Sequence, residues 1–179
     1  MPLIKNGRVV EDRYIKILDD APLPEDVPVI VPATRFLADA EEISRREAPV
    51  GVIWPNNRRV AELLPYLDRL ALVVLVFPTF KDGRAYSQAR LLRERYGFRG
   101  ELRATGQILR DQFLFQVRAG FDALDVAKTS DVDAFAAALA RYTVFYQIAG
   151  EGRISAARRR AARLVAATPG EAALQSASR

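Results

Sequence analysis

The sequence contains no cysteine and no histidine. Without cysteine there is no disulfide, no thiol nucleophile and no cysteine-ligated zinc or iron–sulfur centre. Histidine is the commonest general base and metal ligand, so its absence removes the usual acid–base chemistry as well. Any reaction must use Asp, Glu, Lys, Arg, Ser, Thr or Tyr, or a bound cofactor whose identity the sequence does not indicate. Carboxylates alone can bind magnesium or calcium, but no motif for either ion is present, so we predict no metal site.

Long apolar runs are also missing. No segment approaches the roughly eighteen consecutive apolar residues that a membrane-spanning helix needs. The first residues, MPLIKNGRVVEDRY, lack the apolar core and the small-residue cleavage site of a signal peptide. We therefore expect a cytoplasmic protein that has no membrane partner.

Positive charge is concentrated in two parts of the chain. The net charge is +5, yet residues 81–118 alone carry nine basic and four acidic side chains, and residues 151–179 are basic too. The arginines of the first part indicate either an electropositive surface for an acidic partner protein or nucleic acid, or a solvated helix face with local ion pairs to Glu94 and Glu101. We favour the solvated face for Arg90 and Arg95. No RNA-binding module accompanies the arginine-rich tail, and we do not expect a nucleic-acid partner.

Strand and helix patterns alternate along the chain after a short hairpin. The pair Asn6-Gly7 is favoured in two-residue hairpin turns, and apolar residues flank it. Five strand–helix repeats follow, which is typical of an α/β domain with a mostly parallel sheet. The strands are expected at 29–31, 50–54, 72–77, 101–104 and 121–126, and the helices at 35–47, 57–69, 84–97, 107–119 and 131–147.

The chain is too short for a complete (β/α)8 barrel, which typically needs about 250 residues. The sheet is therefore either open or an incomplete (β/α) barrel, and the pattern alone does not separate the two. We assign residues 1–149 to a single α/β domain. Residues 150–179 form a basic tail that we expect to be partly helical and partly disordered.

Ligands of parallel α/β folds bind beyond the carboxyl ends of the strands. The segments expected there, such as 79–84 and 105–107, combine cations with Thr, Gly and amide side chains. Free backbone N–H groups at helix starts would face the same side, which predicts a site for a small oxyanion or a carboxylate. The alternative is that these residues only cap helices and make turns. The residues predicted to bind the anion or a partner are Lys81, Arg84, Ser87, Arg103, Thr105, Gly106 and Gln107.

Two carboxylates, Asp111 and Asp82, are candidates for moving a proton. Gln112 and Arg118 share an apolar helix with Asp111 and are candidates for supporting it. Asp111 also suits a structural ion pair with Arg103 or Arg118, and we prefer this role because paired buried carboxylates are commonly structural. Neither the P-loop motif GxxxxGK[ST] nor the dinucleotide motif GxGxxG is present, which disfavours classical nucleotide binding.

The block FPTFKDGRAYSQARLLRERYGFRGELRATGQILRDQFLFQVRAGFDAL, residues 77–124, resembles an uncharacterised bacterial family, domain of unknown function 934. We expect the resemblance to cover roughly residues 1–147 and to leave the arginine-rich tail outside. The positions that carry it are Phe80, Asp82, Gly83, Arg84, Ser87, Arg93, Gly100, Arg103, Gly106, Asp111, Gln112, Arg118, Gly120 and Phe121.

Members of that family are often encoded beside assimilatory sulfite reductase, and some are labelled oxidoreductases. The resemblance therefore implies a role in sulfur assimilation without implying a mechanism. We expect an accessory protein of sulfite reduction that binds the reductase, a small oxyanion or both through the basic face at the carboxyl ends of the strands. The alternatives are an enzyme that acts on a small anionic substrate or uses a phosphorylated cofactor, and an assembly scaffold without catalysis.

Overall fold

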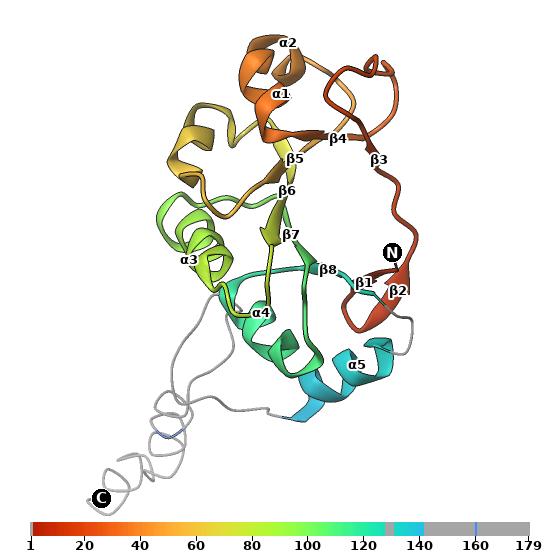
Figure 1. Ribbon diagram of the computed structural model, residues 1–179, viewed down its shortest axis with the longest axis vertical. Coiled ribbons are helices and arrows are strands. Elements are labelled where there is room, and N and C mark those ends of the chain that lie inside the picture. Colours follow the sequence, from red (N-terminus) through yellow and green to blue (C-terminus); the bar gives the residue numbers. More distant parts are fainter. Residues whose placement is uncertain (1, 128–130, 142–159, 161–179) are drawn as a thin grey trace, which may run out of the picture.

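The computed structural model describes residues 2–127, 131–141 and 160 and contains one eight-stranded sheet (Figure 1). The strands lie side by side in the order β2-β1-β8-β7-β6-β5-β4-β3, so that the parallel strands β3 to β8 follow each other as they do in the chain. The strands are β1 Leu3–Lys5, β2 Arg8–Val10, β3 Ile15–Lys16, β4 Val29–Pro32, β5 Val50–Trp54, β6 Leu70–Phe77, β7 Glu101–Gly106 and β8 Ala123–Asp125.

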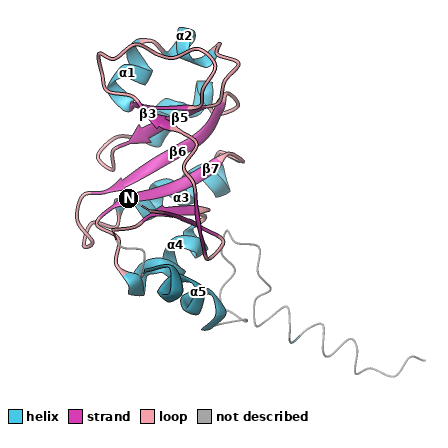
Figure 2. Cartoon of the chain, turned by 90° about the vertical axis from the view of Figure 1, so that its right-hand side faces the viewer, coloured by secondary structure: helices cyan, strands magenta, loops and turns pink. Residues whose placement is uncertain are grey.

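This strand order decides between the two expected architectures. A doubly wound sheet reverses its strand order at a switch point and carries helices on both faces. Here no reversal occurs, the helices cover one face, and the sheet curls into a half-barrel (Figures 1 and 2). The helical segments are α1 Ala33–Ala38, α2 Ala40–Ser44, η1 Val60–Tyr66, α3 Arg84–Arg90, η2 Leu91–Arg95, η3 Arg110–Gln112, α4 Phe113–Ala119 and α5 Asp131–Arg141. Among them, none is both long and apolar enough to cross a membrane.

The predicted hairpin is confirmed at residues 3–10. Asn6 and Gly7 both have positive φ, 53° and 75°, as the two central residues of a type I′ turn require. Strand β1 then pairs antiparallel with β8, with Leu3 opposite Asp125. The beginning of the chain thus borders the end of the parallel run of strands.

Several helices differ from those predicted. The prediction of an α-helix at 57–69 is wrong, because residues 60–66 form a 3₁₀ helix. This helix contains Pro65, which has no backbone N–H to continue the hydrogen bonds of an α-helix. The helix expected at 35–47 is broken at Asp39 into α1 and α2. The short edge strand β3 was not anticipated. The expected end of α5 at residue 147 and nearly all of the basic tail lie outside the described residues.

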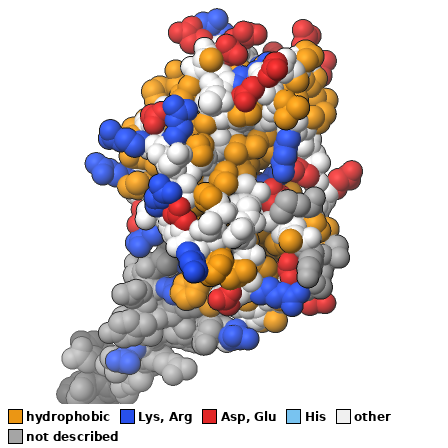
Figure 3. Space-filling model, viewed as in Figure 1, with side chains coloured by type: hydrophobic (Ala, Val, Ile, Leu, Met, Phe, Trp, Pro, Cys, Tyr) orange, Lys and Arg blue, Asp and Glu red, His pale blue; other side chains and the backbone are white. Residues whose placement is uncertain are grey.

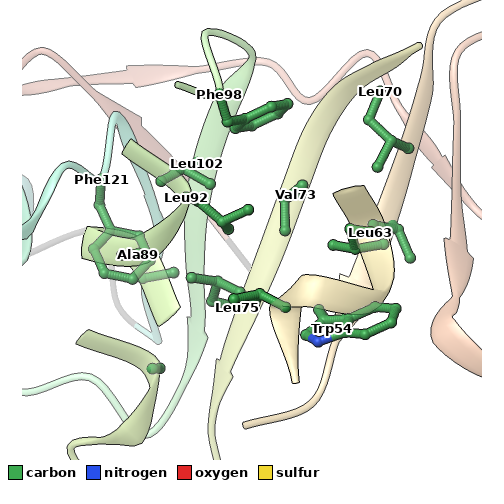
Figure 4. Close-up of a cluster of buried hydrophobic side chains, with 14 of the residues drawn as sticks. Trp54, Leu63, Leu70, Val73, Leu75, Ala89, Leu92, Phe98, Leu102 and Phe121 are labelled. Carbon is green, nitrogen blue, oxygen red and sulfur yellow. The ribbon is translucent and has the colours of Figure 1, made fainter. Parts of the chain in front are cut away.

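The main core lies between the outer face of the sheet and the helices. Figure 4 shows side chains of the strands, such as Trp54, Val73 and Leu75, packed against Leu63 of η1 and Leu92 of η2. All five are fully shielded from solvent, with exposed fractions of zero. This layer fixes η1 and the α3–η2 helix next to each other on the sheet.

The inner face of the half-barrel carries a network of buried charges. Arg103 of β7 has an exposed fraction of 1% and donates to both carboxylate oxygens of Asp12, at 2.6 and 3.2 Å, and to Glu101 at 3.0 Å. Lys5 pairs with Glu101 at 2.7 Å, and Lys16 pairs with the buried Asp125 at 3.3 Å. The connector between β2 and β3 runs along the open side of the half-barrel (Figure 1), and its Asp12 ties it to β7 through Arg103.

The Asp12–Arg103 pair predicts a pH-dependent part of the stability. Burial acts to raise the pKa of Asp12, but hydrogen bonds from Arg103 and from the Tyr14 N–H, with the charges of Arg103 and Lys16, outweigh it and lower the pKa. A lowered pKa in the folded state stabilises the protein above the ordinary aspartate pKa, and this contribution is lost as the pH falls through the lowered value. Asp12→Asn removes one partner of a buried ion pair, so the free energy of unfolding at pH 7 should fall by about 2–3 kcal/mol.

Urea unfolding of wild type and Asp12→Asn between pH 7 and pH 3 measures both effects. The stability of the variant should depend less on pH below neutrality. Asp26→Asn is the matched control, because Asp26 is exposed and its substitution changes the net charge by the same amount. Equal stability of the two variants would contradict a structural role for the Asp12–Arg103 pair.

Gly106, at the end of β7, predicts a second stability effect. Its φ is +101°, and a Cβ built on it would lie 2.3 Å from the carbonyl oxygen of Phe77 in β6. Gly106→Ala therefore forces two strands apart and strains the backbone, and the free energy of unfolding should fall by about 3 kcal/mol. At Gly83 a Cβ would meet only Tyr86, at 3.8 Å, so Gly83→Ala should be close to neutral in the same urea unfolding measurement. Equal stability of the two variants would show that β6 and β7 can yield at this point.

Candidate functional site

The structure does not gather all seven predicted anion-binding residues into one site. Arg103 lies on the inner face, where its guanidinium is engaged by Asp12 and Glu101. The backbone N–H of Gln107 donates to the Phe77 carbonyl at 2.8 Å, and Gly106 packs tightly against the same carbonyl. Both residues therefore have a structural role in holding the end of β7 against β6. Thr105 is part of β7, and Lys81 lies over the ring of Phe80 at 5.6 Å.

The turn Lys81-Asp82-Gly83-Arg84 is closed by its own ion pair. The Arg84 side chain donates to both carboxylate oxygens of Asp82, with the shortest contact 2.7 Å, and the Arg84 backbone N–H donates to Asp82 at 3.2 Å. These hydrogen bonds hold the pKa of Asp82 well below its ordinary value, and the Asp82 carboxylate in turn raises the pKa of Arg84. Asp82 is therefore a poor proton acceptor near neutral pH, and its clearest role is to orient Arg84.

The residues predicted around Asp111 have different surroundings. Gln112 anchors the loop after β6, because its side-chain amide donates to the Phe80 carbonyl at 2.9 Å. The predicted pair of Asp111 with Arg103 is wrong, since Arg103 is held by Asp12 and Glu101 on the inner face. Asp111 is exposed in η3, directly before α4, and Arg118 lies in the last turn of α4.

A pocket of about 350 Å³ opens between the loop that follows β5 and the α3–η2 helix. We call it the arginine pocket, because Arg58 and Arg59 contribute from the loop and Arg84 and Arg95 from the helix. Of the predicted anion-binding residues, it contains Arg84 and Ser87. Lys and Arg side chains gather over these two elements along the left-hand edge of the molecule in Figure 3. The remaining lining residues are Asn56, Val60, Ala61, Gln88, Leu91 and Tyr96.

The helical wall of the pocket is one stripe of the α3–η2 helix. Arg84, Gln88, Leu91 and Arg95 are spaced four, three and four residues apart, so they lie along the same side. The last turn is π-helical, and the Tyr96 N–H donates to the Leu91 carbonyl at 2.9 Å. Single π-helical turns inside α-helices are rare and occur frequently at functional sites.

Gln88 joins this helix to the loop wall. It has an exposed fraction of 6%, and its amide nitrogen donates to the carbonyls of Pro55 and Arg58 at 3.1 and 2.8 Å. The backbone of the loop that carries Arg58 and Arg59 is therefore fixed relative to the helix. The two walls are held at a set separation before any ligand arrives, which lowers the entropic cost of binding.

The four arginines of the pocket differ in how much of their charge is already engaged. Arg84 pairs with Asp82, and Arg58 pairs with Glu62 at 3.7 Å and lies over the Trp54 ring. Arg59 and Arg95 are exposed and form no ion pair with any residue of the described ranges. The pocket therefore presents two guanidinium groups without a counter-charge.

Two buried amides in the pocket wall have unused hydrogen-bonding capacity. Asn56 has an exposed fraction of 6%; it lies close to the Asp82 carboxylate and adds to the lowering of its pKa. Its Nδ2 nevertheless makes no hydrogen bond of normal geometry, and neither does the Oε1 of Gln88, as far as the described residues show. Side-chain atoms of Arg46, Trp54 and Gln116, outside the pocket, share this property, so it does not by itself mark a ligand site.

The arginines of the α3–η2 helix divide by role. Arg90 pairs with Glu94 at 3.2 Å, so the local ion pair favoured for it from the sequence is confirmed. Arg93 is enclosed by the carbonyls of Phe98, Gly100 and Gly120 and by Asp122, which makes it structural. The solvated ion-paired face favoured for Arg95 is wrong in its pairing, because Arg95 has no acidic partner in the described part of the chain and lines the pocket.

Five members of the pocket were not predicted as parts of one site: Asn56, Arg58, Arg59, Gln88 and Arg95. The helical stripe was visible in the sequence as the spacing of Arg84, Gln88, Leu91 and Arg95. The loop wall was hidden because 57–69 looked like an α-helix, which would have placed Arg58 and Arg59 elsewhere. Across the described residues, no group of three or more acidic side chains gathers in a way that could hold a metal ion.

Comparison with known proteins gives a family and no function. No curated protein matches the chain. The model of a family described as bacterial protein of unknown function (DUF934) matches residues 51–156, which is more than half of the 179 residues. The match starts later than the expected residue 1 and extends past residue 147 into the basic tail, and it includes both walls of the arginine pocket. The chain therefore belongs to the bacterial protein family of unknown function DUF934.

Proposed function

We propose that this protein is an accessory protein of assimilatory sulfite reduction that binds a small oxyanion, the reductase or both at the arginine pocket. The observation that carries the anion-binding part is the presence of Arg59 and Arg95, two guanidinium groups without an acidic partner among the described residues, in one pocket. The link to sulfite reduction rests on the resemblance to the family, because members of that family are often encoded beside the reductase.

The pocket has the chemistry that oxyanion binding requires. Guanidinium groups present planar pairs of N–H donors that match the oxygens of sulfite, sulfate or phosphate, and such charge-assisted hydrogen bonds are stronger than neutral ones. Arg84 supplies a third cation, whose orientation Asp82 fixes through the 2.7 Å contact. Ser87 adds a hydroxyl on the same wall. The arrangement favours binding of an anion over proton transfer, since Asp82, the carboxylate that orients Arg84, has a lowered pKa and is a poor proton acceptor.

The same surface suits an acidic partner protein. The pocket opens on the edge of the molecule where Lys and Arg side chains gather (Figure 3). A concentrated positive surface accelerates encounter with a negatively charged partner and fixes its orientation more than it raises affinity. Binding of the reductase through this face would therefore weaken strongly with salt.

The first prediction concerns small anions. Replacing both unpaired arginines, in Arg59→Gln/Arg95→Gln, should weaken binding of sulfite and of inorganic phosphate by about a hundredfold, since each charged hydrogen-bonding group contributes roughly tenfold. Isothermal titration calorimetry of both proteins measures this. Arg69→Gln/Arg99→Gln is the charge-matched control, because both arginines are exposed and lie outside the pocket. Equal weakening in the two double variants would indicate a general charge effect and count against the pocket.

The second prediction concerns the reductase. Purified protein should bind the assimilatory sulfite reductase of its own organism at low salt, and binding should weaken at high salt because the contact is electrostatic. In surface plasmon resonance, Arg59→Gln/Arg95→Gln should lower the association rate constant by a larger factor than it changes the dissociation rate constant. Absence of binding at low salt would exclude the docking role and leave the small oxyanion as the ligand.

A further inference from the structure

The arginine pocket is larger than a bare oxyanion needs. Its volume of about 350 Å³ falls in the range of roughly 300–1,000 Å³ that is typical of sites for small organic molecules. Sulfite or phosphate would occupy only a small part of this space and leave the rest to water. The size of the pocket therefore indicates a ligand with a body beyond its charged group.

The lining of the pocket indicates what that body is like. Between the arginines lie Val60, Leu91 and Tyr96. Leu91 has an exposed fraction of 37%, although it stands on a helix whose neighbouring Leu92 is completely buried in the core. An apolar wall flanked by cations is the arrangement of sites that bind organic anions, because the wall covers the body while the cations fix the charged end.

The position of Leu91 on the helix also favours an organic anion as the ligand. It lies between Gln88 and Arg95 on the stripe that faces the pocket, and it begins the π-helical turn that ends at Arg95. An apolar body placed against Leu91 would lie next to the guanidinium of Arg95.

We propose that the ligand of the arginine pocket is a small organic anion, in which a tetrahedral phosphate or sulfonate group binds Arg59 and Arg95 and an apolar, ring-sized body packs against Leu91 and Tyr96. This inference rests on the proposed anion-binding function and adds the class of ligand to it. It assigns Leu91 as the residue that determines preference for organic over inorganic anions. The charged group supplies attraction, and the body supplies the selectivity.

Calorimetric titration with inorganic phosphate, phenyl phosphate and benzenesulfonate tests the inference directly. At least one of the two ring-bearing probes should bind ten times or more tightly than inorganic phosphate, because covering a ring against an apolar wall contributes roughly that factor or more. A preference for phenyl phosphate or for benzenesulfonate identifies which headgroup the arginines select. If inorganic phosphate binds and neither ring-bearing probe binds more tightly, the inference is overturned while the proposed function stands.

Leu91→Ala provides the matched test of position. It should remove most of the advantage of the ring-bearing probe, so that the affinity for that probe falls by a clearly larger factor than the affinity for inorganic phosphate. Leu64→Ala is the control, since Leu64 is similarly exposed at 46% but lies outside the pocket. An advantage that survives Leu91→Ala places the ring elsewhere and overturns the inference. If none of the three probes binds wild type, both the inference and the small-oxyanion function fall.

Discussion

The constraint on which the structure depends is that every connection between neighbouring parallel strands returns on the same side of the sheet. Strands β3 to β8 therefore lie in chain order, and their helices form a single outer layer. This one-sided winding makes the loop after β5 and the helix after β6 neighbours, because they belong to adjacent strands. The arginine pocket is a direct product of that arrangement, since its two walls are those two segments. Gln88 fixes the separation of the walls by binding the loop backbone across the gap.

One-sided winding also leaves the inner face without helices, and charged side chains compensate for that. The buried Arg103 of β7 depends on its two acidic partners, Asp12 and Glu101, because an unpaired guanidinium inside a protein is strongly destabilising. The connector that carries Asp12 thus covers part of the inner face, as the helices cover the outer face. Tyr14, on the same connector, packs with Ile30, Leu72 and Val74 and completes a small second core. The pocket and the charge network are separate parts of the molecule with separate roles.

Much of the fold could be read from the sequence, and the reasons for the failures are physical. Buried strands such as β6 are recognisable as continuous apolar runs. The pair Asn6-Gly7 predicts its turn because both residues readily adopt positive φ. The segment 57–69 misled because its apolar spacing is helical while Pro65 prevents the α-helical ladder. Arg103 was placed in the wrong site because the alternation of side chains along a strand does not show which of the two sheet faces the helices cover. Only a small part of the site was predicted: Arg84 and Ser87 follow from the carboxyl-end rule, whereas Arg59 and Arg95 need the three-dimensional contact between loop and helix.

The pairing of β1 with β8 has a consequence for how the protein forms. The hairpin precedes the parallel strands in the chain, yet β1 pairs with β8, in which Asp125 lies opposite Leu3 and more than a hundred residues further along. The ion pairs of the inner face span similar separations, as between Lys16 and Asp125. Contacts of this range close large loops and slow folding. Pairing of the hairpin with β8 is therefore among the slower steps expected in folding, because it closes a loop that contains all the parallel strands.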